Sequence, residues 1–306
     1  MTRPAARVMS PELGHAWAGP WSRLLRGLLG RPRLAVGAGL VMVLAGGAAL
    51  GPYVIPHHPL AADFSAVLAP PSRVHPLGTD RLGRDLLSRS VHGGRVSLTV
   101  GALSVVVGMC LGVPIGLVSG YLGGWADGLL MRLADAMLIL PGLILAATIA
   151  LFLGPSLANV TLAIGLVRWP VFARLVRGQV LTIKEREYVV AARAIGAPTS
   201  RILARHVLPN ASTVVTVEAT LSAGFAMFTE ASLSFLGVGV PPPTPTWGGM
   251  LREGYSYLEL APWASLVPGA ALFLGIFAFN FLGDGLRDLA DPAVRRLHRR
   301  AVERRE

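Results

Sequence analysis

The stretch EYVVAARAIGAPTSRILARHVLP, residues 187–209, is a polar interruption between two long apolar segments. Its first part, residues 187–195, is rich in good helix formers. Three apolar residues recur there at helical spacing: Val189, Ala192 and Ile195. Gly196 suits a left-handed helix cap, and a second short helix is expected from Pro198 until Pro209 ends it. The pattern predicts a helix–turn–helix lying on a membrane surface, with its outer face either bound to a cytosolic partner or free.

The composition is that of a membrane protein. Of 306 residues, 53% are hydrophobic and 15% charged, and the mean hydropathy is +0.57. These values are typical of an integral membrane protein. The formal net charge of +11 raises the question of nucleic-acid binding, but the basic residues are not spread over one soluble face. The single cysteine, Cys110, lies in an apolar run and is expected to be a small buried hydrophobe.

Six apolar segments are long enough to span a membrane. They are expected at residues 34–56, 97–119, 132–153, 156–175, 211–239 and 263–285. The fourth is interrupted by Arg168 and Pro170, and its helix is expected to continue past the membrane. We therefore expect an all-α integral membrane protein with six transmembrane helices. Its parts are a basic tail at 1–33, a first helix at 34–56, an outer connection at 57–96, a transmembrane domain at 97–286 and a basic tail at 287–306.

The distribution of Lys and Arg predicts the orientation. With the N-terminus inside, 22 of the 28 basic residues fall in cytosolic segments and 6 in outer segments. This bias follows the positive-inside rule. Both termini and residues 187–209 are therefore expected in the cytosol. The basic charge is then explained by lipid headgroups, and no nucleic acid is expected as a partner.

No motif for covalent chemistry is visible. A Walker A loop needs Gly-Lys-Ser/Thr, but the only lysine, Lys184, lies between Ile183 and Glu185. HExxH, CxxC and GxSxG are absent. Four histidines lie in the outer connection without a carboxylate at ligand spacing, and we expect them to be solvated rather than metal-bound: His57, His58, His75 and His92. We expect no catalytic residue, metal site or cofactor in this chain, and any ATPase would be a separate subunit.

Residues 75–98, HPLGTDRLGRDLLSRSVHGGRVSL, predict a short interfacial helix in the outer connection. Thr79 or Asp80 would cap it. Its leucines would face the membrane or the bundle: Leu82, Leu86 and Leu87. Its charged residues would remain in water: Arg84, Asp85 and Arg89.

Several polar residues fall inside the apolar segments, where burial is costly. They are Asp135, Glu218, Glu230, Asn280 and Asp284. Such groups line a translocation pathway or form hydrogen bonds between helices or subunits, and the sequence leaves both roles open. Asp135 lies three residues after Arg132, and we expect these two side chains to pair.

Four stretches resemble one family. Ala191-Ala192, Gly196 and Leu208-Pro209 are spaced as in the cytoplasmic loop of permease subunits of binding-protein-dependent ABC importers. Residues 75–98, the segment beginning GYLGGWADG at residue 120, and EASLSFLGVGVPPPTPTWGGML at 230–251 resemble the dipeptide/oligopeptide/nickel branch, in its C-type subunit. The loop departs from the family pattern at Val190, where the motif has Glu, and at His206, where it has Ile.

The resemblance implies a type I ABC importer transmembrane domain with a cytoplasmic coupling helix. It implies that the loop docks on an ATPase subunit through Glu187, Tyr188, Ala191, Ala192, Arg193, Gly196, Leu208 and Pro209. The chain would form half of a pathway for di- or oligopeptides in a bacterial inner membrane. Its implied partners are a second permease, ATPase subunits that bind ATP and Mg²⁺, an extracytoplasmic solute-binding protein and membrane lipids.

Three alternatives remain open at this point. An importer of nickel or another small solute in the same branch shares all four stretches. A gradient-driven secondary transporter would need no ATPase, and Glu218 or Glu230 would then be essential. A membrane-embedded hydrolase would need a nucleophile–base pair, and no such motif is visible.

Overall fold

The computed structural model describes residues 32–290, and this part of the chain contains helices but no β-strand. The long helices are α2 (Pro32–Val54), α3 (Leu86–Leu122), α4 (Gly124–Ile139), α5 (Gly142–Leu153), α6 (Leu157–Ile183), α9 (Leu208–Leu236) and α11 (Trp263–Ala290). The short elements are η1 (Phe64–Ala66), α7 (Glu187–Ala194), α8 (Thr199–Ile202), the π-helical turn η2 (Leu203–Val207) and α10 (Trp247–Tyr255). The expected all-α fold is confirmed.

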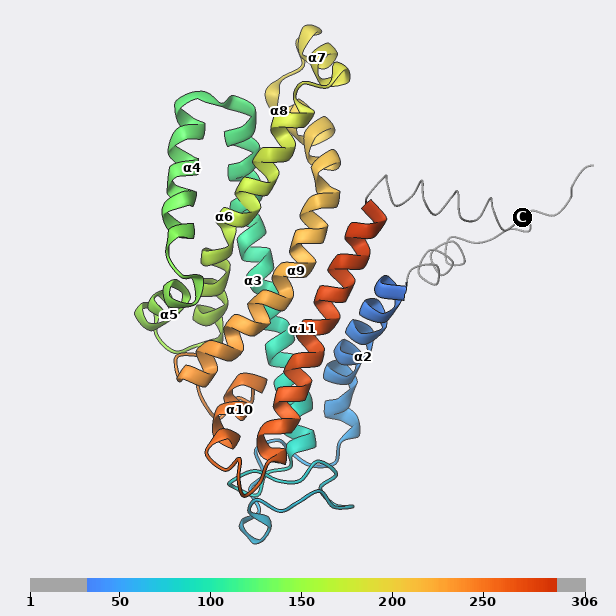
Figure 1. Ribbon diagram of the computed structural model, residues 1–306, viewed down its shortest axis with the longest axis vertical. Helices are drawn as coiled ribbons and strands as arrows, with labels where there is room; N and C mark the ends of the chain where they lie inside the picture. Colours follow the sequence, from blue (N-terminus) through green and yellow to red (C-terminus); the bar gives the residue numbers. More distant parts are fainter. Residues whose placement is uncertain (1–31, 291–306) are drawn as a thin grey trace, which may run out of the picture.

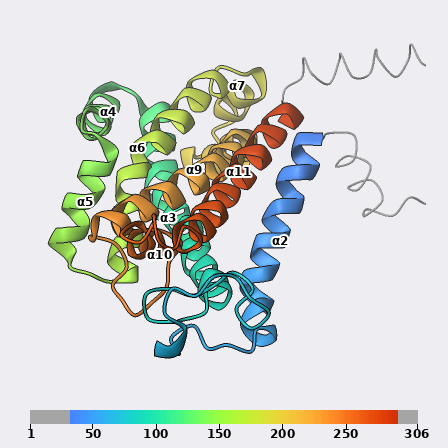
Figure 2. The ribbon, with the colours of Figure 1, turned by 60° about the horizontal axis from the view of Figure 1, so that its bottom comes forward.

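Four helices, α3, α6, α9 and α11, run along the long axis of the molecule (Figure 1). Helix α2 packs on α11 at one side, and α4 and α5 lie against α6 at the other. Helix α7 projects at one end of the bundle. The connection between α2 and α3 and helix α10 gather at the opposite end (Figure 2).

The tightest helix pair is α3 with α6, and glycines spaced four residues apart make it possible. Gly108, Gly112, Gly116 and Gly120 lie on one face of α3. A Cβ atom at Gly112 would lie 2.4 Å from the carbonyl oxygen of Trp169, and one at Gly116 would lie 2.4 Å from that of Ala173. Small residues at four-residue spacing let two backbones approach in this way.

The predicted spans need two corrections. Five described helices are long and apolar enough to cross a membrane, or six if α4 and α5 count as one bent span. A single helix at 132–153 was wrong, because the chain bends by 95° between α4 and α5, at Pro141. Helix α3 begins at Leu86, so the outer connection ends near residue 85 and not at 96.

The remaining spans agree more closely with expectation. Helix α6 runs on to Ile183, as predicted from its polar second half, and α11 ends at Ala290. Arg33 and Asp288 form an ion pair at 3.5 Å between α2 and α11. Cys110 is exposed on α3, not buried as expected. The predicted tails, apart from their residues 32–33 and 287–290, lie outside the described residues.

Candidate functional site

The segment that joins α6 to α9 has a buried apolar base. Val189 is fully buried and Ala192 is 8% exposed. They share one cluster with Val176, Val180, Ile183, Ile202, Val207, Ala211 and Val215. The loop is therefore anchored to the two long helices that it connects, α6 and α9.

The turn after α7 is a Schellman motif built around Gly196. The Gly196 N–H donates to the carbonyl of Arg193 at 3.0 Å, and the Ala197 N–H donates to that of Ala192 at 3.1 Å. Gly196 has φ +79°, in the left-handed region where a side chain is unfavourable. The predicted glycine cap is confirmed.

The outer face of the loop is exposed and partly apolar. Ile195 is 85% exposed, Val190 48% and Tyr188 45%. Of the eight predicted coupling residues, seven are exposed: Glu187, Tyr188, Ala191, Arg193, Gly196, Leu208 and Pro209. Ala192 is the buried exception. Ile195, which recurs with Val189 and Ala192 at helical spacing, does not share their buried face, because the helix ends just before it and the Gly196 turn directs the chain outward.

The second half of the loop also differs from expectation, because Pro209 does not end a helix. Residues 199–202 are α-helical, 203–207 form a π-helical turn, and the chain continues directly into α9. The Leu208 N–H donates to the Leu203 carbonyl, a bond over five residues. A π turn absorbs the missing proline N–H by shifting the hydrogen-bond register, so Pro209 is tolerated in the first turn of α9. The His206 ring lies 6.2 Å from that of Tyr188 and helps to fix the exposed tyrosine.

The charged residues near this end pair across helices. Asp127 of α4 accepts two hydrogen bonds from Arg177 of α6, at 2.6 and 2.7 Å. Asp135 pairs with Arg174 of α6, not with Arg132 as predicted. The expected pair was wrong because a partner from the neighbouring helix reaches the carboxylate, which spacing along α4 cannot show.

Two carboxylates in α9 are engaged in hydrogen bonds inside the bundle. Glu218 binds Arg168 of α6 at 2.8 Å. Glu230 is fully buried and accepts from Ser97 of α3 at 3.1 Å and from Ser234 at 2.8 Å. The geometry of both gives the inter-helix hydrogen bonds that were one of the two predicted roles. Asn280 is exposed on α11, and a pathway role for it stays a prediction.

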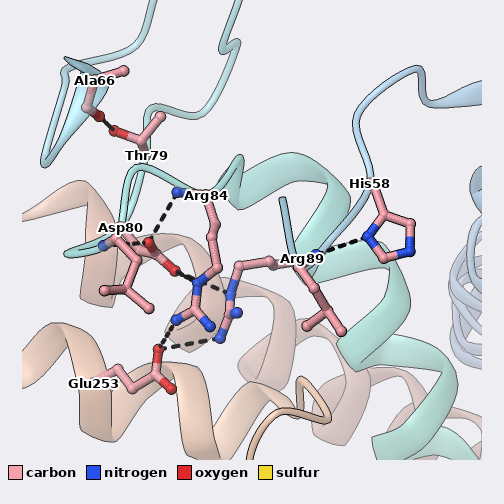
Figure 3. A network of polar contacts seen from close by, with 9 residues as sticks. His58, Ala66, Thr79, Asp80, Arg84, Arg89 and Glu253 are labelled. Carbon is pink, nitrogen blue, oxygen red and sulfur yellow. Dashed lines mark hydrogen bonds and ion pairs between the residues drawn. The ribbon is translucent and has the colours of Figure 1, made fainter. Parts of the chain in front are cut away.

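The opposite end holds a cluster of four alternating charges: Asp80, Arg84, Arg89 and Glu253 (Figure 3). Arg84 contacts Asp80 and Glu253, each at 2.6 Å. Arg89 lies 3.2 Å from Asp80 and 3.1 Å from Glu253. The two positive and two negative groups neutralise one another, which reduces the cost of burying them. Through Glu253, the cluster joins the α2–α3 connection to α10.

This cluster overturns the prediction for residues 79–89. No helix begins at Thr79 or Asp80. Asp85 caps α3 instead, accepting from the Ser88 N–H at 2.7 Å. The groups expected in water are buried: Arg84 is 7% exposed, Asp85 3% and Arg89 2%. Glu253, the partner of Arg84 and Arg89, is 169 residues from Arg84 in the sequence, so no local pattern could reveal this burial.

A family model connects this geometry with known proteins. The model described as "Binding-protein-dependent transport system inner membrane component" matches residues 112–296. That is more than half of the chain, and it includes the α7–α8 loop. The chain belongs to this family. This permease is therefore a multi-pass inner-membrane component of a transport system.

Similar proteins cover nearly the whole permease. It is 42% identical over 278 residues to the glutathione transport system permease protein GsiD of Pectobacterium atrosepticum, covering 90% of this chain and 92% of that protein. It is 38% identical over 292 residues to the dipeptide transport system permease protein DppC of Alkalihalophilus pseudofirmus, covering 95% and 96%. It is 44% identical over 268 residues to the di/tripeptide permease protein DppC of Pseudomonas aeruginosa, covering 85% and 88%.

Proposed function

We propose that this permease forms half of the translocation pathway of an ATP-driven importer for di- and oligopeptides, and that α7 and α8 couple it to an ATPase. One observation carries the coupling role: an exposed apolar tip stands on a buried base. Tyr188, Val190 and Ile195 offer the contact surface, while Val189 and Ala192 anchor it in the bundle. Exposed apolar side chains gathered on one projection favour a protein partner.

The proposed partners are the other subunits of a binding-protein-dependent importer. This chain has no Gly-Lys-Ser/Thr loop, so ATP and Mg²⁺ bind to separate ATPase subunits and this permease is non-catalytic. A homologous second permease completes the pathway, and an extracytoplasmic binding protein delivers the solute. Helices such as α2, α4, α5 and α11 expose apolar side chains, and these faces contact membrane lipids and the second permease. No nucleic acid is involved.

The proposed orientation places the α7 end in the cytosol. The beginning of α2 and the end of α11 lie toward the same end of the bundle as α7 (Figure 1). Both chain termini then emerge on the cytosolic side, as the distribution of basic residues predicts. The charge cluster around Glu253 faces the extracytoplasmic side.

The mechanism is a rigid-body movement. Closure of the ATPase pair displaces α7, and the apolar base transmits this displacement to α6 and α9. Because α3 and α6 are in backbone contact through their glycines, α3 moves with them. The pathway thereby alternates between inward- and outward-facing states.

The proposed solute class rests on the relatives, whose names specify glutathione, dipeptides or di- and tripeptides. An importer for nickel is less well supported, because the three relatives described above are named for glutathione or for small peptides. A secondary transporter or a hydrolase does not fit membership in this family.

Photo-cross-linking from the exposed tip tests the coupling role. A photoreactive amino acid is placed at Ile195 in the full-length permease, in cells that express its native partners. We expect a covalent adduct with an ATP-binding subunit, identified by mass spectrometry. The same amino acid at Leu258, 44% exposed at the opposite end, is the matched control and should give no such adduct. An ATPase adduct from Leu258 but not from Ile195 would reject the proposal.

A further inference from the structure

Two histidines and an aspartate from three separate segments meet at the end of the bundle opposite α7. They are His57, which follows α2, His75 of the connection, and Asp85 at the start of α3. One ligand atom of each lies within 4.8 Å of the other two. His75 Nδ1 is 3.0 Å from Asp85 Oδ1, and the ring centroids of His57 and His75 are 5.0 Å apart. The sequence showed no carboxylate at ligand spacing from these histidines, but the fold brings Asp85 next to His57 and His75.

Hydrogen bonds hold the backbone at His57 and His75 and the side chain of Asp85. The Ser88 hydroxyl donates to the His57 carbonyl at 2.6 Å, and the Ser88 N–H donates to Asp85 Oδ2 at 2.7 Å. The same serine therefore positions two of the three residues. The backbone N–H of His75 donates to Ser72 Oγ at 3.0 Å, and its carbonyl accepts from Gly78 at 2.9 Å. Pre-positioned side chains lose less entropy when they bind a ligand.

The charge of Asp85 also favours a cation. Its side chain is 2% exposed, and among residues 32–290 its ion-pair partner within 4.0 Å is His75 alone. The buried carboxylate of Asp80, by comparison, contacts two arginines. A buried carboxylate needs a positive partner, and a divalent cation between the two imidazoles would supply one.

We infer that His57, His75 and Asp85 bind a divalent transition-metal ion, with Zn²⁺ the best match. Two imidazole nitrogens, one carboxylate oxygen and one water form a common four-coordinate zinc site. In a tetrahedral site with bonds of about 2.0–2.1 Å, ligand atoms lie about 3.3 Å apart. The His75–Asp85 distance of 3.0 Å is close to this value, and the ligand atom of His57 lies within 4.8 Å of both, so a small movement of the His57 side chain completes the site.

The ion would be a structural cross-link. It would fasten the segment after α2 and the loop before Thr79 to the start of α3, where Asp85 directly follows Arg84 of the charge cluster. It is a resident ion and not the transported solute, so the inference does not depend on the proposed function.

The test is a zinc titration of the full-length permease, purified with the subunits that accompany it, against a chromophoric chelator. We expect one more tightly bound Zn²⁺ per permease in the wild type than in His57→Ala or His75→Gln, and at least about a 10-fold weaker affinity in each variant. Glutamine at position 75 retains a side-chain N–H for Asp85. His58→Ala is the matched control, because His58 is exposed and accepts from its own loop at the Leu60 N–H (Figure 3). It should bind zinc like the wild type.

A second readout separates binding from folding. Zn²⁺ should raise the unfolding temperature of the wild type and of His58→Ala, but not that of the other two variants, since a ligand stabilises only a protein that binds it. Co²⁺ in place of Zn²⁺ should give the intense visible absorption of a four-coordinate site in the wild type and in His58→Ala. His57→Ala and His75→Gln should lack this absorption. Equal zinc stoichiometry in the wild type and the His57→Ala/His75→Gln double variant overturns the inference, as does a wild type without such absorption.

Discussion

Gly196 is the residue on which the geometry of the α7–α8 loop depends. Its φ of +79° closes the Schellman motif and directs Ile195 away from the bundle. No atom lies near the position of a Cβ atom there, so the constraint is conformational and not steric crowding. A left-handed backbone costs an ordinary residue about 1–2 kcal/mol, and a β-branched residue more.

We predict that Gly196→Val abolishes transport while membrane insertion and yield stay at wild-type levels. The strained turn reorients the exposed tip, and a cost above about 2 kcal/mol, as expected for a β-branched residue, lowers the population of the docked geometry more than about 30-fold. The measurement is solute uptake into cells, normalised to permease in the membrane. Gly128→Val is the control, since Gly128 lies inside α4 with open space around it. Normal uptake by Gly196→Val contradicts this role of the turn.

Glu253 is the residue that closes the charge cluster at the other end. It accepts hydrogen bonds from Arg84 and Arg89, which come from the α2–α3 connection and from α3. Removing its charge leaves two buried guanidinium groups with Asp80 as their shared counter-ion.

We therefore expect Glu253→Gln to lower the free energy of unfolding by about 2 kcal/mol, because charge-assisted hydrogen bonds are lost. Thermal unfolding of the purified permease in detergent measures this change. Glu259→Gln, at an exposed position on the same side, should leave the unfolding temperature unchanged. Equal stability of the two variants would show that the cluster contributes nothing measurable.

At the scale of the element, the pairing of α3 with α6 is the central contact. The glycines of α3 permit backbone approach, so this interface is sensitive to any added side chain. The loop base packs against α6 and α9, and the buried Glu230 of α9 accepts a hydrogen bond from Ser97 of α3.

The element-scale prediction is that Gly116→Val destabilises the bundle. Its Cβ atom alone would meet the Ala173 carbonyl oxygen at 2.4 Å, which forces the helices apart. Overpacking of this kind costs about 1–3 kcal/mol. The reduced unfolding temperature should be absent in Gly39→Val, where no atom lies within 4 Å of the new Cβ atom on α2. Identical unfolding of both variants contradicts close α3–α6 packing.

Sequence reasoning predicted the elements better than their ends and breaks. Apolar runs located α2, α6, α9 and α11 well, because burial in lipid requires continuous hydrophobicity. Sequence reasoning missed the bend between α4 and α5, because hydropathy does not show whether an apolar segment is straight. Pro141 marks the position of the bend. Sequence reasoning also missed the extra turns at the start of α3. Their charged residues are typical of a solvent-exposed segment, and only the fold shows that Arg89 pairs with Glu253.

At the scale of the whole molecule, the predictable part of the site was the local part. Gly196 and the inward position of Val189 and Ala192 follow from spacing along one helix. The pairs Asp135–Arg174 and Arg84–Glu253 and the group of His57, His75 and Asp85 depend on segments that only the complete fold brings together. Contacts of this kind require the three-dimensional arrangement.

In the described part of the permease, α7 lies at one end of the helix bundle (Figure 1). The connection between α2 and α3, which carries the charge cluster, lies at the other end. Helices α3, α6 and α9 run between the two ends and pack against one another. The coupling role proposed for α7 and α8 requires that an ATPase displaces α7 during transport.

The most direct measurement is dipeptide uptake into proteoliposomes that contain the assembled transporter and its binding protein. We predict uptake that requires ATP inside the vesicles and persists when proton and sodium gradients are collapsed. Ile195→Asp should reduce it at least tenfold with unchanged unfolding temperature, because Ile195 is 85% exposed and surface changes alter stability by about 0.5 kcal/mol or less. Gradient-driven uptake without ATP, or wild-type uptake by Ile195→Asp, would contradict the account.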